Sequence, residues 1–168
     1  LVEEQVFIPS TESYEFLKKD LGNLSYINEQ NQLFLFMGGN LYQVDIKGHT
    51  YQIVRDGIKA GHFVSSTSNA SGAWMAGTDI YHCTEIGIIN FETGKTRRIR
   101  SEDGVYMKAH GFLNEDLVYG MAREENIVSD TSGKKVFAMD SLRIEDFAGN
   151  LVKEYIQPDQ FIIDVQMN

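Results

Sequence analysis

The sequence has a single cysteine, Cys83, among its 168 residues, and this scarcity excludes two kinds of site. One thiol cannot form an internal disulfide, and a zinc site built on several cysteines is excluded as well. The chain also lacks any apolar run close to the roughly 20 residues that a membrane-spanning helix needs. It contains 2 prolines against 15 glycines, so we expect frequent turns and few stiff linkers.

No charged and then apolar leader begins the chain at Leu1, so no signal peptide is expected in this sequence. The initiator methionine is also missing, which is typical of a chain that has been processed or cut from a longer protein. A leader is among the segments that such processing removes. An extracytoplasmic or cell-envelope location is therefore favoured over a cytoplasmic one, although the sequence leaves the compartment open.

Basic residues are outnumbered by acidic ones, 15 against 24, so the formal net charge is -9. The acidic residues are spread along the chain, and a diffuse negative field repels phosphate backbones. We therefore expect no nucleic-acid partner. One compact basic cluster lies in a presumed outer strand, where a solvated strand face is favoured over a site for polyanions; its residues are Lys95, Arg97, Arg98 and Arg100.

Helical periodicity is rare, whereas the composition, at 42% hydrophobic and 11% aromatic residues, is that of a globular domain. The segment Tyr14 to Gly22, YEFLKKDLG, fits one or two helical turns and fits an alternating strand equally well. Elsewhere short runs with a period of two residues are broken by Gly, Asn and Asp. The continuous apolar run Leu33 to Met37 is typical of a strand that is buried on both faces.

Three hairpins of similar design recur at intervals of about 50 residues, with turns at Gly48, Gly94 and Gly149. Upstream of each hairpin lies a further pair of strands around a polar turn. The chain thus contains three units of four antiparallel strands, here called A, B, C and D in chain order. The units cover about residues 23–55, 62–100 and 106–156.

Four-stranded meanders with this period resemble the blades of β-propellers, in particular quinoprotein-like and TolB-like repeats with a Gly-Lys type C–D turn. The expected fold is therefore all-β, with antiparallel four-stranded meanders arranged as about three blades of one domain, residues 1–168. Partial blades are expected at both ends, as a hairpin over 5–18 and a strand over 161–167. Either these ends combine into a fourth blade, or they pair with missing blades or with another copy of the chain.

The candidate site lies in the B–C loops, because long loops on a rigid scaffold commonly carry function. These loops lengthen along the chain, from GGN to GTDIYHCTEIG and then to AREENIVSDTSGKK. The candidate ligand-binding residues are Asp79, Tyr81, His82, Glu85, Arg123, Glu124 and Glu125, with Cys83 and Asp130 in the same loops. For any one of them, an ordinary surface position is the competing interpretation.

Neither a catalytic residue, a metal nor a cofactor is predicted. His82 and Cys83 are adjacent, but neighbouring residues of an extended segment point to opposite faces, so one buried and one exposed side chain is expected. His62 and His110 occupy similar A-strand positions, and without a third ligand they are interpreted as hydrogen-bonded strand residues.

Two functions remain open, and binding is favoured over catalysis. The first is a binding or scaffolding module that recognises a protein, peptide or glycan through the B–C and D–A loops. The second is part of a carbohydrate-active propeller enzyme, a hydrolase or lyase, that uses loop carboxylates. Glycoside hydrolysis needs two carboxyl groups about 5–10 Å apart, one of them with a raised pKa.

Overall fold

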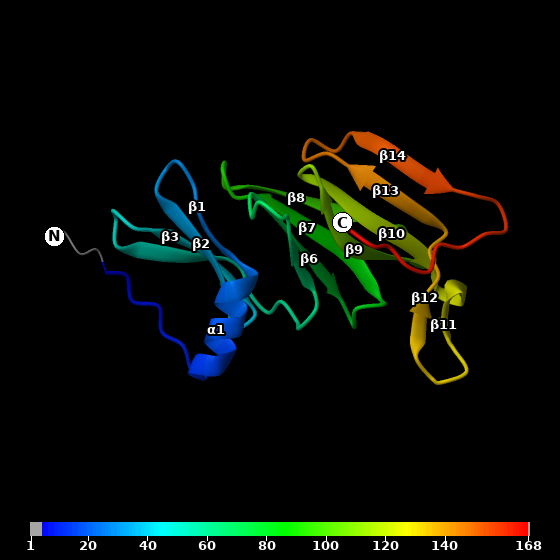
Figure 1. Ribbon diagram of the computed structural model, residues 1–168, viewed down its shortest axis with the longest axis horizontal. Helices are drawn as coiled ribbons and strands as arrows, with labels where there is room; N and C mark the ends of the chain where they lie inside the picture. Colours follow the sequence, from blue (N-terminus) through cyan, green and yellow to red (C-terminus); the bar gives the residue numbers. More distant parts are fainter. Residues whose placement is uncertain (1–4, 168) are drawn as a thin grey trace.

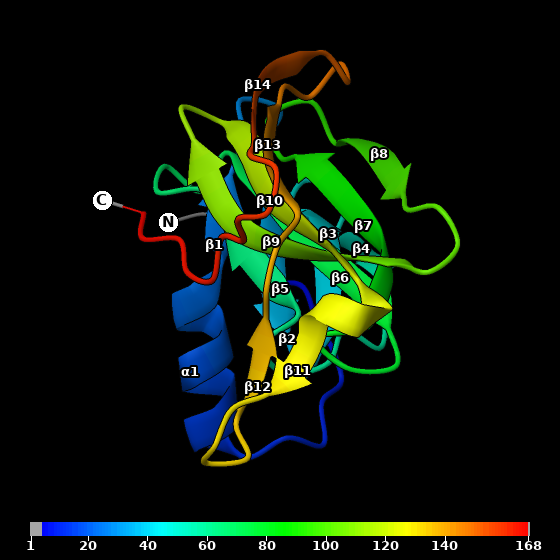
Figure 2. The same cartoon turned by 90° about the vertical axis from the view of Figure 1, so that its right-hand side faces the viewer.

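The computed structural model describes residues 5–167, with side chains omitted for 19–23, and its strands form three four-stranded antiparallel sheets and one two-stranded sheet. The three larger sheets lie in a row along the molecule, the second between the first and the third (Figure 1). Both views show that the helix and the two-stranded hairpin project to the same side of this row, the helix near the first sheet and the hairpin near the third (Figure 1 and Figure 2). The prediction of an all-β fold built from four-stranded meanders is confirmed.

Each large sheet takes its four strands in chain order, as the meander pattern predicts. The first sheet contains β1 (Ser25–Ile27), β2 (Gln32–Met37), β3 (Asn40–Asp45) and β4 (Thr50–Arg55). The second contains β5 (Phe63–Ser65), β6 (Ser71–Gly77), β7 (Cys83–Asn90) and β8 (Lys95–Arg100). The third contains β9 (Val105–Leu113), β10 (Asp116–Arg123), β13 (Ser141–Glu145) and β14 (Leu151–Ile156).

An insertion separates the middle strands of the third sheet, in the segment that the sequence presents as a long loop. It consists of a 3-10 turn, η1 (Glu124–Asn126), and a hairpin of β11 (Ile127–Ser129) and β12 (Lys135–Phe137). The insertion therefore has its own backbone pairing, which holds its side chains in place.

The turns confirm the positions predicted for them. Gly94 and Gly149 have φ of 67° and 97°, in the left-handed region that favours glycine. In the first hairpin the left-handed residue is His49, with φ of 54°, and not Gly48. The amide of Gly48 instead donates a hydrogen bond of 2.9 Å to Asp45 Oδ1, which closes that turn.

Apolar side chains fill the space between neighbouring sheets and hold them face to face. Between the first and second sheets, the rings of Phe36 and Phe63 are stacked with centroids 4.7 Å apart, and Trp74 is buried in the same cluster. Between the second and third sheets, Met75 and Tyr119 belong to a second buried cluster. Burial of these faces is the main stabilising term of the fold.

The N-terminal strand pair predicted over 5–18 is wrong. Helix α1 (Tyr14–Asn23) occupies its second half, and residues 5–13 contain no strand. Val6, Ile8 and Leu17 pack on the outer face of the first sheet, beside Tyr42. With no neighbouring strand to pair with, the segment satisfies its backbone groups internally as a helix.

The C-terminal strand predicted over 161–167 is also wrong. Its backbone pairing is confined to one antiparallel bridge, in which Ile162 exchanges hydrogen bonds of 2.8 and 3.0 Å with Met139. Ile162 and Val165 pack on the outer face of the third sheet, far from the N-terminal segment that covers the first. The described ends therefore do not combine into a fourth blade, and the row of sheets stays open.

No helix within residues 5–167 is long and apolar enough to cross a membrane.

Candidate functional site

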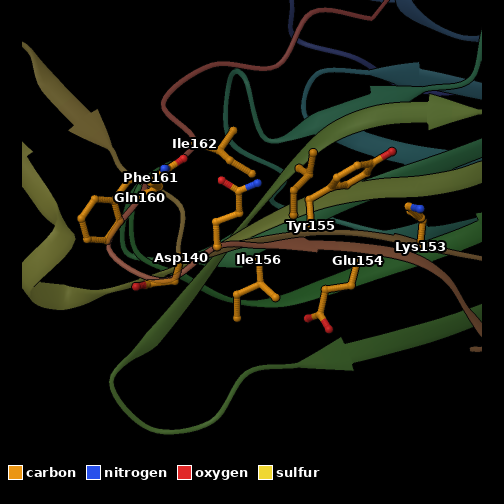
Figure 3. A pocket seen from close by; sticks show the side chains of 10 residues that line it. Asp140, Lys153, Glu154, Tyr155, Ile156, Gln160, Phe161 and Ile162 are labelled. Atoms are coloured by element: carbon orange, nitrogen blue, oxygen red, sulfur yellow. The ribbon is translucent and has the colours of Figure 1, made fainter.

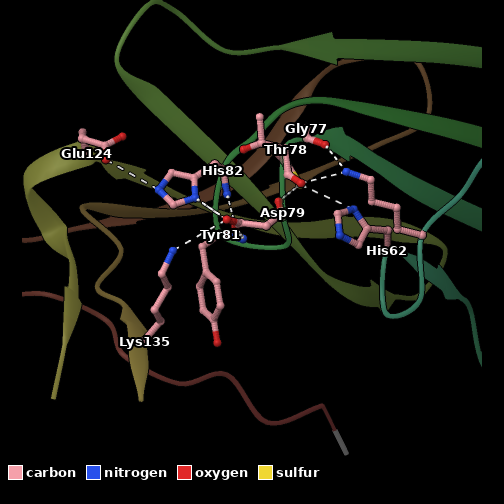
Figure 4. A network of polar contacts seen from close by, with 10 residues as sticks. His62, Gly77, Thr78, Asp79, Tyr81, His82, Glu124 and Lys135 are labelled. Atoms are coloured by element: carbon pink, nitrogen blue, oxygen red, sulfur yellow. Dashed lines mark hydrogen bonds and ion pairs between the residues drawn. The ribbon is translucent and has the colours of Figure 1, made fainter. Parts of the chain in front are cut away.

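The candidate site lies where the loop between β6 and β7 meets the insertion of the third sheet. Asp79 organises the loop, because its Oδ1 accepts hydrogen bonds from the amides of Tyr81, at 2.8 Å, and His82, at 3.1 Å. An aspartate that binds amides two and three residues ahead in this way fixes a tight turn. The turn places Tyr81 and His82 toward the insertion (Figure 4).

The imidazole of His82 lies between two carboxylates from different sheets. Its Nδ1 is 2.9 Å from Asp79 Oδ1, and its Nε2 is 3.6 Å from Glu124 Oε1 at the start of η1 (Figure 4). The ring of Tyr106, on β9, meets the imidazole edge to face with centroids 4.9 Å apart. These contacts fix the orientation of an imidazole that is only 17% exposed.

The same contacts keep the carboxylate of Asp79 ionised. The hydrogen bond from His82, then that from the Tyr81 amide, lower the pKa of Asp79 to about 2. Lys135 Nζ, 3.6 Å from Asp79 Oδ2, adds a smaller effect in the same direction. On the other side of the imidazole, a hydrogen bond to Glu124 raises the pKa of the Tyr106 phenol.

Tyr81 presents an aromatic ring flanked by two amines. Lys135 Nζ lies 5.6 Å from the ring centroid and Lys108 Nζ lies 5.9 Å from it, within the range of cation–π attraction. Together with Asp79, His82 and Glu124, these side chains form a surface of mixed charge around an aromatic ring. We call this surface the His82 cluster; its members are Asp79, Tyr81, His82, Tyr106, Lys108, Glu124 and Lys135.

Cys83 is fully buried while His82 remains partly exposed, as the adjacent-residue argument predicts. The thiol donates to the carbonyl of Asp79, with Sγ and O 3.1 Å apart, and lies 3.8 Å from Nδ1 of the buried His62. Burial raises the pKa of Cys83 to about 11, so the thiolate that a nucleophile needs is disfavoured. Nε2 of His82 faces a carboxylate oxygen of Glu124 at 3.6 Å, and a carboxylate in that position is not the hydroxyl or thiol of a nucleophilic triad.

The two A-strand histidines are engaged within the protein. Nδ1 of His62 is 3.2 Å from the carbonyl oxygen of Met75, and Nε2 of His110 is 3.2 Å from the sulfur of Met139. Burial lowers the pKa of His110 to about 4, so its imidazole is neutral at pH 7. Within the described part of the chain, no three His, Cys, Asp or Glu side chains form a group that fits a metal ion.

The structure brings together four of the predicted site residues, Asp79, Tyr81, His82 and Glu124. Glu85 is not a loop residue: it lies in β7 and pairs with Arg100, at 3.0 Å, so its assignment to the loop is wrong. Asp130 is used within the turn of the β11–β12 hairpin, where Oδ1 accepts from the amides of Ser132 and Lys134.

The two remaining predicted residues lie beside the cluster. Arg123 ends β10, and its amide donates a hydrogen bond of 3.0 Å to Asp140 Oδ2. Glu125 follows Glu124 in η1 and is exposed. Sequence reasoning missed Tyr106, Lys108 and Lys135, which lie on strands and come to the loop from another sheet.

A hollow lies apart from these loops, between the end of β14 and the C-terminal segment. It has a volume of about 560 Å³ and is lined by Tyr155 and Ile156 on one side and by Phe161 and Ile162 on the other (Figure 3). None of the predicted site residues lines it.

No protein-family model matches the chain, and no curated protein matches it. Among solved structures, a chain of the crystal structure of a mitotic checkpoint complex is similar, with a TM-score of 0.30 and 9% sequence identity. The similarity covers 82% of this chain and 64% of that one, so the chain spans less than two thirds of its length. A likeness this distant does not bear on function, and the fold class follows from the sheets themselves.

Proposed function

We propose that the chain is a non-catalytic binding module that recognises a protein or peptide through the His82 cluster. The observation that carries the proposal is the convergence of two loops, from two different sheets, on one oriented imidazole. Side chains that are fixed before binding lose little conformational entropy when a ligand arrives. Asp79, Glu124 and Lys135 remain substantially exposed around that imidazole and are available to a partner.

The chemistry of the cluster suits a polypeptide. Tyrosine rings are enriched where proteins bind one another, and charged side chains commonly lie around them at the rim. A peptide offers amides and charged side chains that complement both the carboxylates and the two lysines. A glycan is a weaker fit, because sugars stack on open aromatic faces and the ring of Tyr81 has an amine within 6 Å on two sides.

The hydrolase alternative requires a carboxyl group that holds a proton near neutral pH. Asp79 has the opposite property, since its pKa is lowered to about 2 by His82 and the Tyr81 amide. The imidazole also lies between Asp79 and Glu124, in the space that a glycosidic bond would occupy between two catalytic carboxyls. These observations favour binding over hydrolysis.

Two parallel selections on the immobilised chain test the proposal. A phage-displayed library of random peptides provides the polypeptide arm, and a glycan array provides the other. The affinity of a selected peptide is then measured by calorimetry for wild type and for His82→Gln, which should weaken binding by about tenfold or more because a fixed contact residue is lost.

Glu124 and Glu125 supply a matched pair of variants, because they are neighbours in η1 and only Glu124 faces the imidazole. Glu124→Gln should weaken peptide binding, and Glu125→Gln should leave it within about twofold of wild type. Enrichment of glycans without peptides would contradict the proposal. Equal effects of the two glutamate substitutions would place the binding surface elsewhere.

A further inference from the structure

Two cavities lie where the second sheet meets the edge strand of the first. One has a volume of about 260 Å³ and the other about 100 Å³, and both have Arg55 and Trp74 in their linings. The larger cavity is also lined by Asp56, Thr96 and Arg98. Its basic and hydroxyl groups come from the two D strands, β4 and β8, and its carboxylate comes from the loop that follows β4.

Strand register explains why these side chains share one cavity. Trp74 pairs with Gly87 on β7, and Gly87 pairs with Arg98 on β8, so the three residues form one row on a single face of the sheet. Gly87 has no side chain, and the indole of Trp74 lies directly on it. The indole thereby reaches toward β8, where Arg98 and Thr96 project from the same face.

The lining of the cavity contains hydrogen-bond donors whose partners within the protein are few or absent. Nε1 of Trp74 is buried and has no acceptor among the described residues. The backbone of Arg55 pairs with Leu41 in the first sheet, but among the described side chains its guanidinium forms no ion pair or hydrogen bond. Arg98 forms only a long ion pair with Glu85, at 3.7 Å, and its side chain is 57% exposed, whereas Arg100 bonds the same carboxylate at 3.0 Å.

Buried polar groups without a partner are rare, and the indole N–H of Trp74 is one that a water or a bound molecule at this place would explain. Two guanidinium groups and a hydroxyl at one cavity match a carboxylate, which accepts paired hydrogen bonds from arginine. The volume is below that of sites for drug-sized ligands, so the ligand is small. Asp56, the one carboxylate among the residues that line the cavity, favours a ligand that also carries a hydroxyl donor and disfavours a multiply charged anion.

We propose that this cavity binds a small hydroxycarboxylic acid, with Arg55 and Arg98 on the carboxylate. The site is separate from the His82 cluster, and its ligand differs from a polypeptide, so either proposal can fail without the other. The overall charge of -9 does not oppose it, because two local arginines outweigh distant, screened carboxylates for a ligand with one negative charge.

The test uses the single tryptophan of the chain. In ¹⁵N-labelled protein, Trp74 gives one indole N–H resonance, which reports directly on the cavity wall. Lactate is titrated into the full chain and is compared with acetate, with phosphate and with a short glutamate-containing peptide, all at matched ionic strength in sodium chloride. We expect a saturable shift with lactate, at a dissociation constant of about 1 mM, and a weaker one with acetate.

Arg98 and Arg100 provide the matched control, since both approach Glu85 and only Arg98 lines the cavity. Arg98→Gln and Arg55→Gln should each weaken lactate binding about tenfold, and Arg100→Gln should leave it unchanged. The dispersion of the amide spectrum verifies that each variant is folded. No saturable shift up to about 50 mM lactate, an equal effect of Arg100→Gln, or binding of only phosphate or only the acidic peptide would overturn the proposal.

Discussion

Replacement of Gly87 by alanine should destabilise the protein through the only tryptophan of the chain. Gly87 is buried in β7, and the atom nearest to an added Cβ belongs to the indole of Trp74. That indole is 3% exposed and packs among the apolar side chains between the first and second sheets. A rigid ring in a close-packed interior cannot move aside without displacing its neighbours.

The magnitude follows from two opposing effects. Overpacking of a core costs about 1–3 kcal/mol, and a rigid ring places this site at the upper end, near 3 kcal/mol. Alanine in place of glycine restricts the unfolded chain and returns about 0.5–1 kcal/mol, since the backbone at Gly87 is not left-handed. The free energy of unfolding should therefore fall by about 2 kcal/mol. For a chain of this length, that corresponds to a decrease in Tm of roughly 4–8 °C.

Urea and thermal unfolding, followed by circular dichroism, measure this change. Gly120→Ala is the matched comparison, because its added Cβ would meet the unbranched side chain of buried Met139, which adapts its shape more readily than a rigid indole. Gly120→Ala should cost less than half as much as Gly87→Ala. In the double variant Gly87→Ala, Trp74→Phe, the smaller ring should remove most of the added cost. A neutral Gly87→Ala, or strict additivity in the double variant, would refute the packing argument.

Three further predictions follow from the site and from the C-terminal segment. The pKa of Asp79 is about 2 in the folded chain, below its unfolded value of about 3.9. The contribution of the Asp79 carboxylate to stability is thus complete above about pH 4 and is lost as the pH falls toward 2. In urea titrations, the difference in the free energy of unfolding between wild type and Asp79→Asn should therefore shrink to near zero between those two pH values. Cys83 is buried with its pKa raised to about 11, and a thiol reagent at pH 8 should label the native chain far more slowly than the unfolded one; equal rates would show an accessible thiol. Truncation before Phe161 removes the bridge of Ile162 to Met139 and its apolar contacts, and should lower Tm by several degrees; an unchanged melting curve would show that the segment does not stabilise the third sheet.

The three sheets could be predicted from the sequence because their determinants are local. Strands of period two, joined by short turns, pair with their neighbours in the chain, and the turn residues set the register. The polar turns at Asn31, Asn69 and Asn114 all contain left-handed residues, as does the Gly94 hairpin. The face-to-face packing of the sheets followed from the aromatic residues at strand positions.

The ends of the chain could not be predicted in this way. YEFLKKD alternates like a strand and also fits a helix, and the absence of a neighbouring strand decides in favour of α1. The C-terminal segment is apolar enough for a strand, yet pairing reaches only Ile162. Both outcomes depend on which surfaces remain uncovered after the sheets pack, and that information is not local.

The candidate site was predicted in part, for a related reason. Asp79 and His82 are three residues apart, so their contact is a property of one loop. Glu124 lies in the next long loop and was selected for its position there. Lys108 and Tyr106 lie on β9 and meet the loop only because the third sheet packs beside the second, so no sequence pattern places them there. Lys135 ends the same long loop as Glu124 and is brought to Asp79 by the pairing of β11 with β12.

The most direct test of the proposed function is to map the surface on which a selected peptide binds. Amide and side-chain resonances of the labelled chain are followed by NMR as the peptide is added. The account predicts that the perturbed residues cluster at 79–82, Tyr106, Glu124 and Lys135, with little change along β4 and β8. Perturbations centred on the hollow between β14 and Phe161, or on the cavity beside Trp74, would contradict the assignment of binding to the His82 cluster.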